Sequence, residues 1–197
     1  FFILLQTNQR ERTFPMPHPS RHTAKRRLLT AAAVLLAVLL AAGFILNFTV
    51  GKAISSISGG MISPEFIISA FCLTILVIRP NVPQALVIGL ISAAVIQITT
   101  TSPFVDFAAE GVAAMLMAII VSAGMRGGAK KVIPAIGPFV TTVVSGVIFM
   151  IIRIAMVGAA QELAAAMLPV VFATAIFNAI LVQALYIPVC KALKVND

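Results

Sequence analysis

Charged residues are scarce in this sequence, and their scarcity indicates the class of protein. Only 10% of the 197 residues are Asp, Glu, Lys or Arg, whereas 60% are hydrophobic and the mean hydropathy is +1.09. A soluble domain of this composition would have too few polar side chains to cover its surface. The composition therefore predicts an all-α integral membrane protein.

Residues that carry catalytic or metal chemistry are also few. The two histidines, His18 and His22, lie near the N-terminus, and the two cysteines, Cys72 and Cys190, lie inside apolar runs. No H-E-x-x-H, G-x-S-x-G or nucleotide-binding G-x-x-x-x-G-K-[ST] pattern occurs. We therefore expect no intramembrane enzyme, metal site, cofactor or disulfide framework, and no ATPase within this chain.

Apolar runs broken by Gly, Pro or charge predict six transmembrane helices. We expect them at about residues 28–49, 64–79, 82–101, 104–125, 132–158 and 163–190. Residues 26–194 then form one membrane domain, and residues 1–25 form a disordered, basic cytoplasmic tail. Because the sequence begins at Phe1, Met16 is a candidate natural start, with residues 1–15 an added segment or an over-long gene prediction.

Lys and Arg residues indicate the orientation of these helices. All of them except Lys52 and Arg153 precede the first predicted span, lie between the second and third or the fourth and fifth, or follow the sixth. By the positive-inside rule this side is the cytoplasm, so both termini lie on the inner side of the plasma membrane. Topology thus explains the net charge of +8, and we expect no nucleic-acid partner.

Polar side chains within the predicted spans gather in the external half of the membrane. They are Glu65, Gln97, Asp106, Glu110 and Arg153, with Asn178 and Gln183 deeper. A charge at the bilayer centre costs at least about 2.5–3.5 kcal/mol unless it is paired or faces a water-filled cavity. Asp106 and Glu110 share a helix face and require a positive partner, either Arg153 or the ammonium group of a ligand. Two interpretations remain open, a buried ion pair that aligns helices or an external binding site, and we favour the site.

The first predicted helix and the loop after it carry two further patterns. Ala33, Ala37 and Ala41 recur every four residues and form a flat strip that another helix could approach closely. The loop that follows is external, rich in Gly and Ser, and able to cover a pocket. Packing inside the helical bundle explains the alanine strip equally well. An ordinary connecting loop explains the Gly- and Ser-rich segment equally well.

The assembled pattern resembles the substrate-binding S component of an energy-coupling factor transporter, within the family's tryptophan-transporter branch. The residues that carry the resemblance are "GGMISPEFIISAFCLTILVIRP" (59–80), "LVIGLISAAVIQITTTSP" (86–103), "TTVVSGVIF" (141–149) and "MLPVVFATAIFNAILVQALYIPV" (167–189). The resemblance implies a membrane coupling subunit and two ATPase subunits as partners, docked on Ala33, Ala37 and Ala41. It also implies that Glu110 and Asn178 contact the substrate.

One departure from the family concerns the aromatic residues. Many members that bind vitamins stack the ligand on Trp or Tyr, but this sequence has no Trp and a single Tyr, Tyr186, near the inner side. Phenylalanines would have to replace them, and the candidates are Phe66, Phe104, Phe107 and Phe149.

The ligand's chemistry can be argued from charge. An α-amino acid needs an anion beside its ammonium group and a cation beside its carboxylate, and Asp106 with Glu110 opposite Arg153 offers both. We therefore expect capture of tryptophan or a related aromatic amino acid from outside, followed by ATP-driven uptake through the partner subunits. A vitamin or vitamin precursor such as thiamine or cobalamin is the alternative ligand. A stand-alone proton-coupled carrier is the alternative mechanism.

Overall fold

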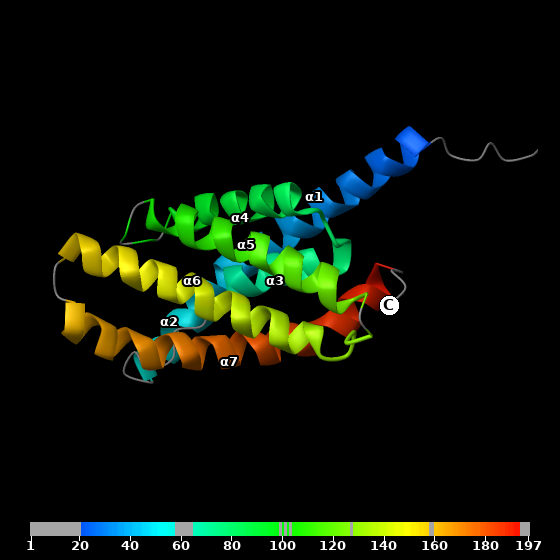
Figure 1. The fold of residues 1–197 in the computed structure, drawn as a ribbon. Coiled ribbons are helices and arrows are strands. Elements are labelled where there is room, and N and C mark those ends of the chain that lie inside the picture. The colour runs from blue at the N-terminus through cyan, green and yellow to red at the C-terminus, as the bar shows by residue number, and fades with distance from the viewer. Residues whose placement is uncertain are drawn as a thin grey trace, which may run out of the picture. The chain divides into compact units, whose positions relative to one another are not determined.

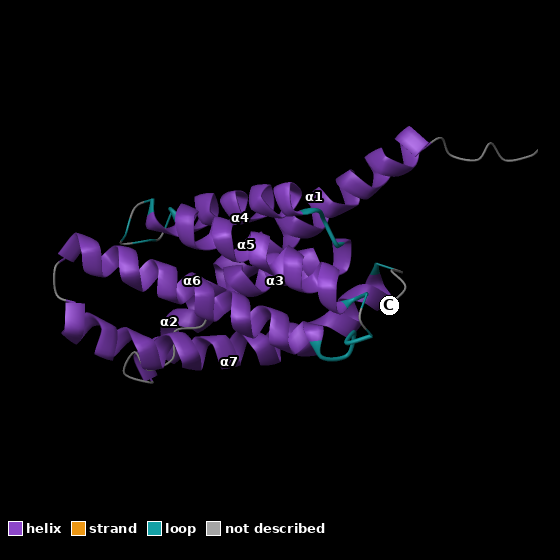
Figure 2. Cartoon of the chain, in the orientation of Figure 1, coloured by secondary structure: helices purple, strands orange, loops and turns teal. Residues whose placement is uncertain are grey.

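The computed structural model describes residues 21–57, 65–98, 100, 102, 104–126, 128–157 and 160–193, and every regular element in them is helical (Figures 1 and 2). The elements are α1 (Arg21–Leu46), the π-helix η1 (Asn47–Gly51), α2 (Lys52–Ile57), α3 (Phe66–Ile78), α4 (Val82–Ile96), α5 (Val105–Gly124), α6 (Ile133–Val157) and α7 (Ala160–Ala192). The expected all-α class is therefore confirmed for the described residues.

The chain divides into two compact units, residues 1–31 and residues 32–197. The predicted tail of residues 1–25 lies mostly outside the described residues, although α1 already begins at Arg21. The second unit contains the rest of α1 and all the other helices.

Among the described residues, four segments are long and apolar enough to cross a bilayer, as expected of a membrane protein. They are Ala33–Ile54, Val105–Gly124, Ile133–Met156 and Ala164–Ala192. Helices α3 and α4 correspond to the second and third predicted spans but contain only 13 and 15 residues. At 1.5 Å per residue they are about 20 Å long, shorter than the roughly 30 Å hydrocarbon core. Their length alone therefore does not identify them as spans.

Helix α3 is the central helix of the second unit. Every residue from Phe66 to Val77 is buried, because α3 packs against α4, α5, α6 and α7 (Figure 1). A helix that is apolar on all sides is typical of such an enclosed position. The uniform hydrophobicity of α3 thus reflects burial in protein.

The end of α1 continues as helix where the sequence predicted an external loop. After Leu46 the chain passes through η1 and α2 and stays helical to Ile57, whereas the first span was expected to end near residue 49. Leu36 and Leu40 of α1 pack against Ile67 and Ala70 of α3. This contact brings η1 and α2 to the N-terminal end of α3. The Gly- and Ser-rich part of the expected loop, residues 58–64, lies outside the described residues.

A glycine permits the close packing of α4 against α5. A Cβ atom at Gly89 would lie 2.6 Å from the carbonyl oxygen of Glu110 and 2.7 Å from the Cβ of Ala114. Both distances are far below a normal carbon contact, so only Gly fits between these backbones. Gly89 therefore holds the part of α5 that carries Glu110 against α4.

We predict that Gly89→Ala lowers stability by about 1–3 kcal/mol, because the added methyl group must push α4 away from α5. Thermal unfolding in detergent measures the loss. The matched control is Gly111→Ala on α5, whose Cβ would meet only leucine methyl groups at 3.2 and 3.6 Å. Equal unfolding temperatures for Gly89→Ala and the unmodified protein would contradict this packing.

Candidate functional site

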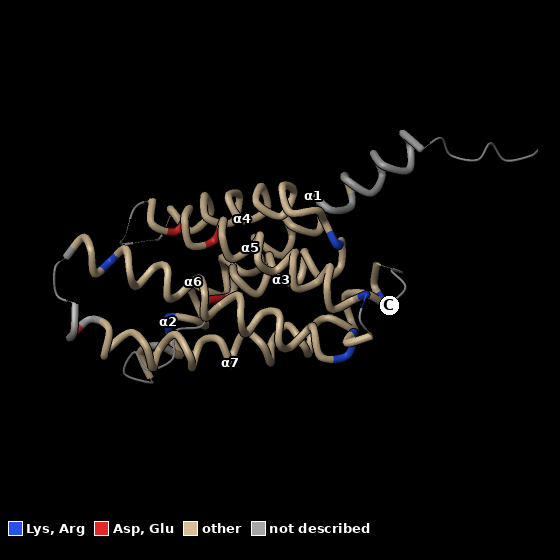
Figure 3. The backbone as a smooth tube through the Cα atoms, in the orientation of Figure 1, with Lys and Arg blue, Asp and Glu red and all other residues tan. Residues whose placement is uncertain are grey.

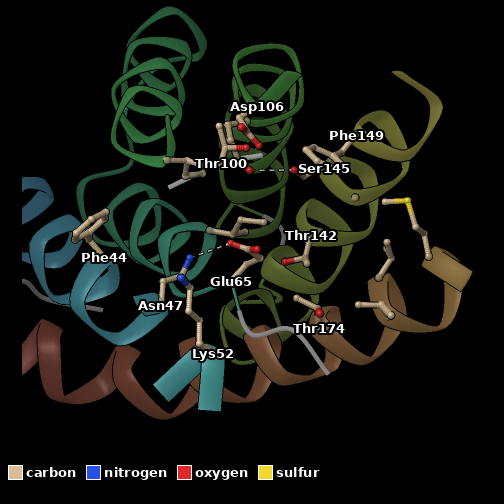
Figure 4. Close-up of a pocket in the computed structure, with 18 of the residues that line it drawn as sticks. Phe44, Asn47, Lys52, Glu65, Thr100, Asp106, Thr142, Ser145, Phe149 and Thr174 are labelled. Atoms are coloured by element: carbon tan, nitrogen blue, oxygen red, sulfur yellow. Dashed lines mark hydrogen bonds between the residues drawn. The ribbon is translucent and has the colours of Figure 1, made fainter. Parts of the chain in front are cut away.

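A pocket of about 420 Å³ lies in the second unit, between the end of α1 and helices α5, α6 and α7 (Figure 4). Small-molecule sites commonly enclose about 300–1,000 Å³. Its charged lining residues are Lys52, Glu65, Asp106 and Glu110, and its hydroxyl residues are Thr100, Thr142, Ser145 and Thr174. Phe44, Phe48 and Phe149 add aromatic surface. The pocket therefore combines an acidic wall with apolar surface.

Helix α5 contributes two carboxyl groups one turn apart. Asp106 and Glu110 are only 6% and 3% exposed. Oδ2 of Asp106 accepts a hydrogen bond from Nε2 of Gln97 at 3.2 Å, and Oε1 of Glu110 accepts one from Oγ of Ser145 at 3.2 Å. Oε2 of Glu110 is buried without a hydrogen-bond partner among the described residues. An unsatisfied buried acceptor costs about 1–3 kcal/mol, so this oxygen is a favourable position for a ligand's donor.

The third carboxyl group belongs to Glu65, at the N-terminus of α3. Asn47 of the π-helix η1 holds this end of α3 with both atoms of its amide. Its Oδ1 accepts from the N–H of Phe66 at 2.9 Å, and its Nδ2 donates to Oε2 of Glu65 at 3.2 Å. Asn47 thus caps α3 from a neighbouring helix and fixes Glu65 in the pocket wall. Single π-turns are often found at functional sites.

Arg153 does not neutralise these acids. Its Nη1 donates to Oγ of Ser102 at 2.7 Å, and Arg153 does not line the pocket. Within the described part of the chain, the side chains that donate to Glu65, Asp106 and Glu110 are the neutral Asn47, Gln97 and Ser145. The buried ion pair between Arg153 and the α5 acids, which the sequence left open, is therefore not formed.

Lys52 is the basic residue that does line the pocket. It begins α2, and its Nζ lies 4.3 Å from the centre of the Phe48 ring. In Figure 4 Lys52 lies beside Asn47 in the lower part of the view, and Asp106 lies in the upper part. Sequence analysis placed Lys52 in an external loop and gave it no role.

The two expected amide residues lie just outside the lining. Gln97 contacts Asp106 and also accepts from the N–H of Phe104 at 3.0 Å, so it connects the end of α4 to the start of α5. Asn178 is fully buried, and its Nδ2 donates to Oγ1 of Thr142 at 3.2 Å. Both amides therefore support pocket residues from behind.

Of the four candidate phenylalanines, Phe149 alone is among the lining residues. Phe107 stacks on Phe104 with ring centres 6.4 Å apart. Phe66 makes an edge-on contact of 5.6 Å with Phe177. The rest of the aromatic lining comes from Phe44 and Phe48, which sequence analysis did not select.

Several lining residues were missed although signals for them existed. Asn47 is an amide near the end of an apolar run, the same signal that selected Gln97. Thr142 and Ser145 are three residues apart, a spacing that places two hydroxyl groups on one helix face. The role of Lys52 had no such signal, because it depends on the helix continuing past residue 49.

Comparisons with known proteins were negative, so the interpretation of the site rests on its geometry. No protein-family model matches this chain, and no curated protein or solved structure does either.

We predict that Asn47→Ala lowers stability by about 1–3 kcal/mol, because it removes the partners of the Phe66 N–H and of the Glu65 carboxyl group together. Thermal unfolding in detergent tests this. The control is Asn81→Ala, which removes the exposed cap of α4 and should cost about 1 kcal/mol or less. If the Asn47→Ala protein were as stable as the Asn81→Ala protein, the two hydrogen bonds between η1 and α3 would contribute no more to stability than an exposed helix cap.

Proposed function

We propose that this protein captures a small, amine-bearing ligand in the pocket and acts as the substrate-binding subunit of an energy-coupling factor importer. The observation that carries the proposal is a 420 Å³ pocket with three carboxyl groups, none of them in an ion pair with a described Lys or Arg. An ammonium group placed there would form charge-assisted hydrogen bonds, which are roughly twice as strong as neutral ones. We propose that the ammonium group donates to Oε2 of Glu110, which has no other partner among the described residues.

The proposed topology has six membrane helices, both termini in the cytoplasm, and the pocket open to the outside. It is supported by the distribution of basic residues in the second unit. Figure 3 shows Lys and Arg gathered where the α3–α4 loop, the α5–α6 loop and the end of α7 meet. The acids of the pocket lie away from this end, as the positive-inside rule would place an external site.

Tryptophan or a related aromatic amino acid is our first candidate ligand. Its ammonium group would face the carboxyl groups, and its ring would pack against phenylalanine side chains of the lining. A cationic vitamin or vitamin precursor such as thiamine is the second candidate. It is favoured by the excess of acidic over basic residues on the lining, three carboxyl groups against Lys52.

The proposed energy source is a partner complex of a coupling subunit and two ATPases. Ala33, Ala37 and Ala41 are exposed on α1 and leave a flat surface for another helix. The competing mechanism is a stand-alone carrier in which the buried acids transfer protons. Isolation of the protein with its partners separates the two mechanisms.

We predict that Glu110→Gln weakens binding of tryptophan or thiamine at least about tenfold, because one charged hydrogen bond contributes about 1.5–3 kcal/mol. Isothermal titration in detergent measures the dissociation constant. Glu162→Gln is the matched control, since Glu162 is exposed on α7 and outside the pocket. If Glu110→Gln bound both compounds as tightly as Glu162→Gln does, the assignment of this acid would be wrong.

We predict that Ala37→Leu prevents isolation of the ATPase subunits with the tagged protein while leaving ligand binding intact. A leucine in the strip would keep the partner helix at a distance. Val38→Leu, at the neighbouring exposed position, should retain the partners. Uptake by the chain alone, driven by a proton gradient and unaffected by Ala37→Leu, would support the carrier instead.

A further inference from the structure

We infer that Lys52 binds a carboxylate of the ligand, so that the pocket selects compounds carrying a positive and a negative group together. This inference rests on the proposed function, because it extends the same pocket. It replaces Arg153 by Lys52 as the residue that determines whether a zwitterion or a simple cation is preferred.

The first support is the position of the Lys52 ammonium group. Lys52 is exposed yet lines the pocket, so it lies at the opening. Its Nζ is 4.3 Å from the centre of the Phe48 ring, and Phe48 lines the same pocket. A cation over an aromatic face is attracted by the ring's negative surface. The ammonium group is therefore held beside the pocket by a side chain that also belongs to it.

The second support is that Lys52 remains unpaired with the acids of its own pocket. Three carboxyl groups line the cavity, and none is in an ion pair with Lys52. In Figure 4 Lys52 lies beside Asn47 in the lower part of the view and Asp106 lies in the upper part, with Glu65 between them. The pocket thus has its basic residue on one side and Asp106 on the other.

The third support comes from the acidic wall. Glu110 is 3% exposed, and its Oε2 has no partner among the described residues. The ammonium group of a ligand would supply a donor to this buried acceptor. The wall thus receives the positive end of a ligand and leaves its negative end for Lys52.

Charge balance then decides between ligand classes. A purely cationic ligand would be repelled by Lys52 while the acids attract it. A zwitterion instead gains an attraction at each end, and the same lysine then discriminates against simple cations. An amino acid is the smallest common compound of this kind.

The test measures the binding of three probes by isothermal titration. Tryptophan carries both charges, its methyl ester keeps only the ammonium group, and indole-3-propionate keeps only the carboxylate. The proteins are the unmodified chain, Lys52→Met and the control Arg153→Met. A methionine keeps the apolar stem of either residue and removes its charge.

The unmodified protein and Arg153→Met should bind tryptophan at least about tenfold more tightly than the ester, as expected for one charged hydrogen bond. Lys52→Met should bind tryptophan and the ester equally, with its affinity for the ester at least as high as that of the unmodified protein. Retained ester binding also shows that this variant is folded. Indole-3-propionate should bind most weakly to every protein.

Two results would overturn the inference while leaving the proposed amine site intact. One is an unmodified protein that binds the ester, or thiamine, as tightly as tryptophan. The other is a Lys52→Met protein that keeps the full preference for tryptophan over the ester. If the unmodified protein bound none of tryptophan, the ester and thiamine, the proposed function itself would fail.

Discussion

The burial of carboxyl groups inside an apolar helical protein is the constraint on which the rest of the structure depends. Transfer of an ionised carboxylate out of water is costly unless hydrogen bonds or opposite charges replace the lost solvent. Here each acid of the pocket accepts from a neutral donor: Asn47 for Glu65, which is part-buried, Gln97 for Asp106 and Ser145 for Glu110. Neutral donors offset this cost only in part. The remaining acceptor capacity faces a cavity and is not used in an ion pair with a described Lys or Arg.

The fold places these groups precisely because its helices are held at close range. Helix α3 is enclosed by four others, so its N-terminus, where Glu65 lies, has a fixed position. Gly89 lets the backbone of α4 approach that of α5 at Glu110. Asn47 connects η1 to α3 through two hydrogen bonds. Pocket residues far apart in the sequence are thereby held by contacts between backbones and buried side chains.

Much of the fold, and less of the pocket, could be predicted from the sequence. Apolar runs predicted helices close to α5, α6 and α7, because hydrophobic length is a strong signal. Sequence analysis did not predict that helix continues from Leu46 to Ile57, because the Gly and Ser residues in and after this segment are typical of loops. Polar residues within apolar runs identified Asp106 and Glu110. Which polar groups meet depends on how each helix is rotated about its axis, and the sequence does not specify this rotation. Arg153 therefore turned out to contact Ser102 outside the pocket.

The account's central claim is that the buried carboxyl groups hold the cationic part of a ligand. Carbodiimide labelling of carboxyl groups, located by mass spectrometry, tests it most directly on the purified protein. The account predicts that saturating tryptophan or thiamine protects Glu110 while exposed Glu162 is modified to the same extent as before. Equal modification of Glu110 with and without both compounds would contradict it.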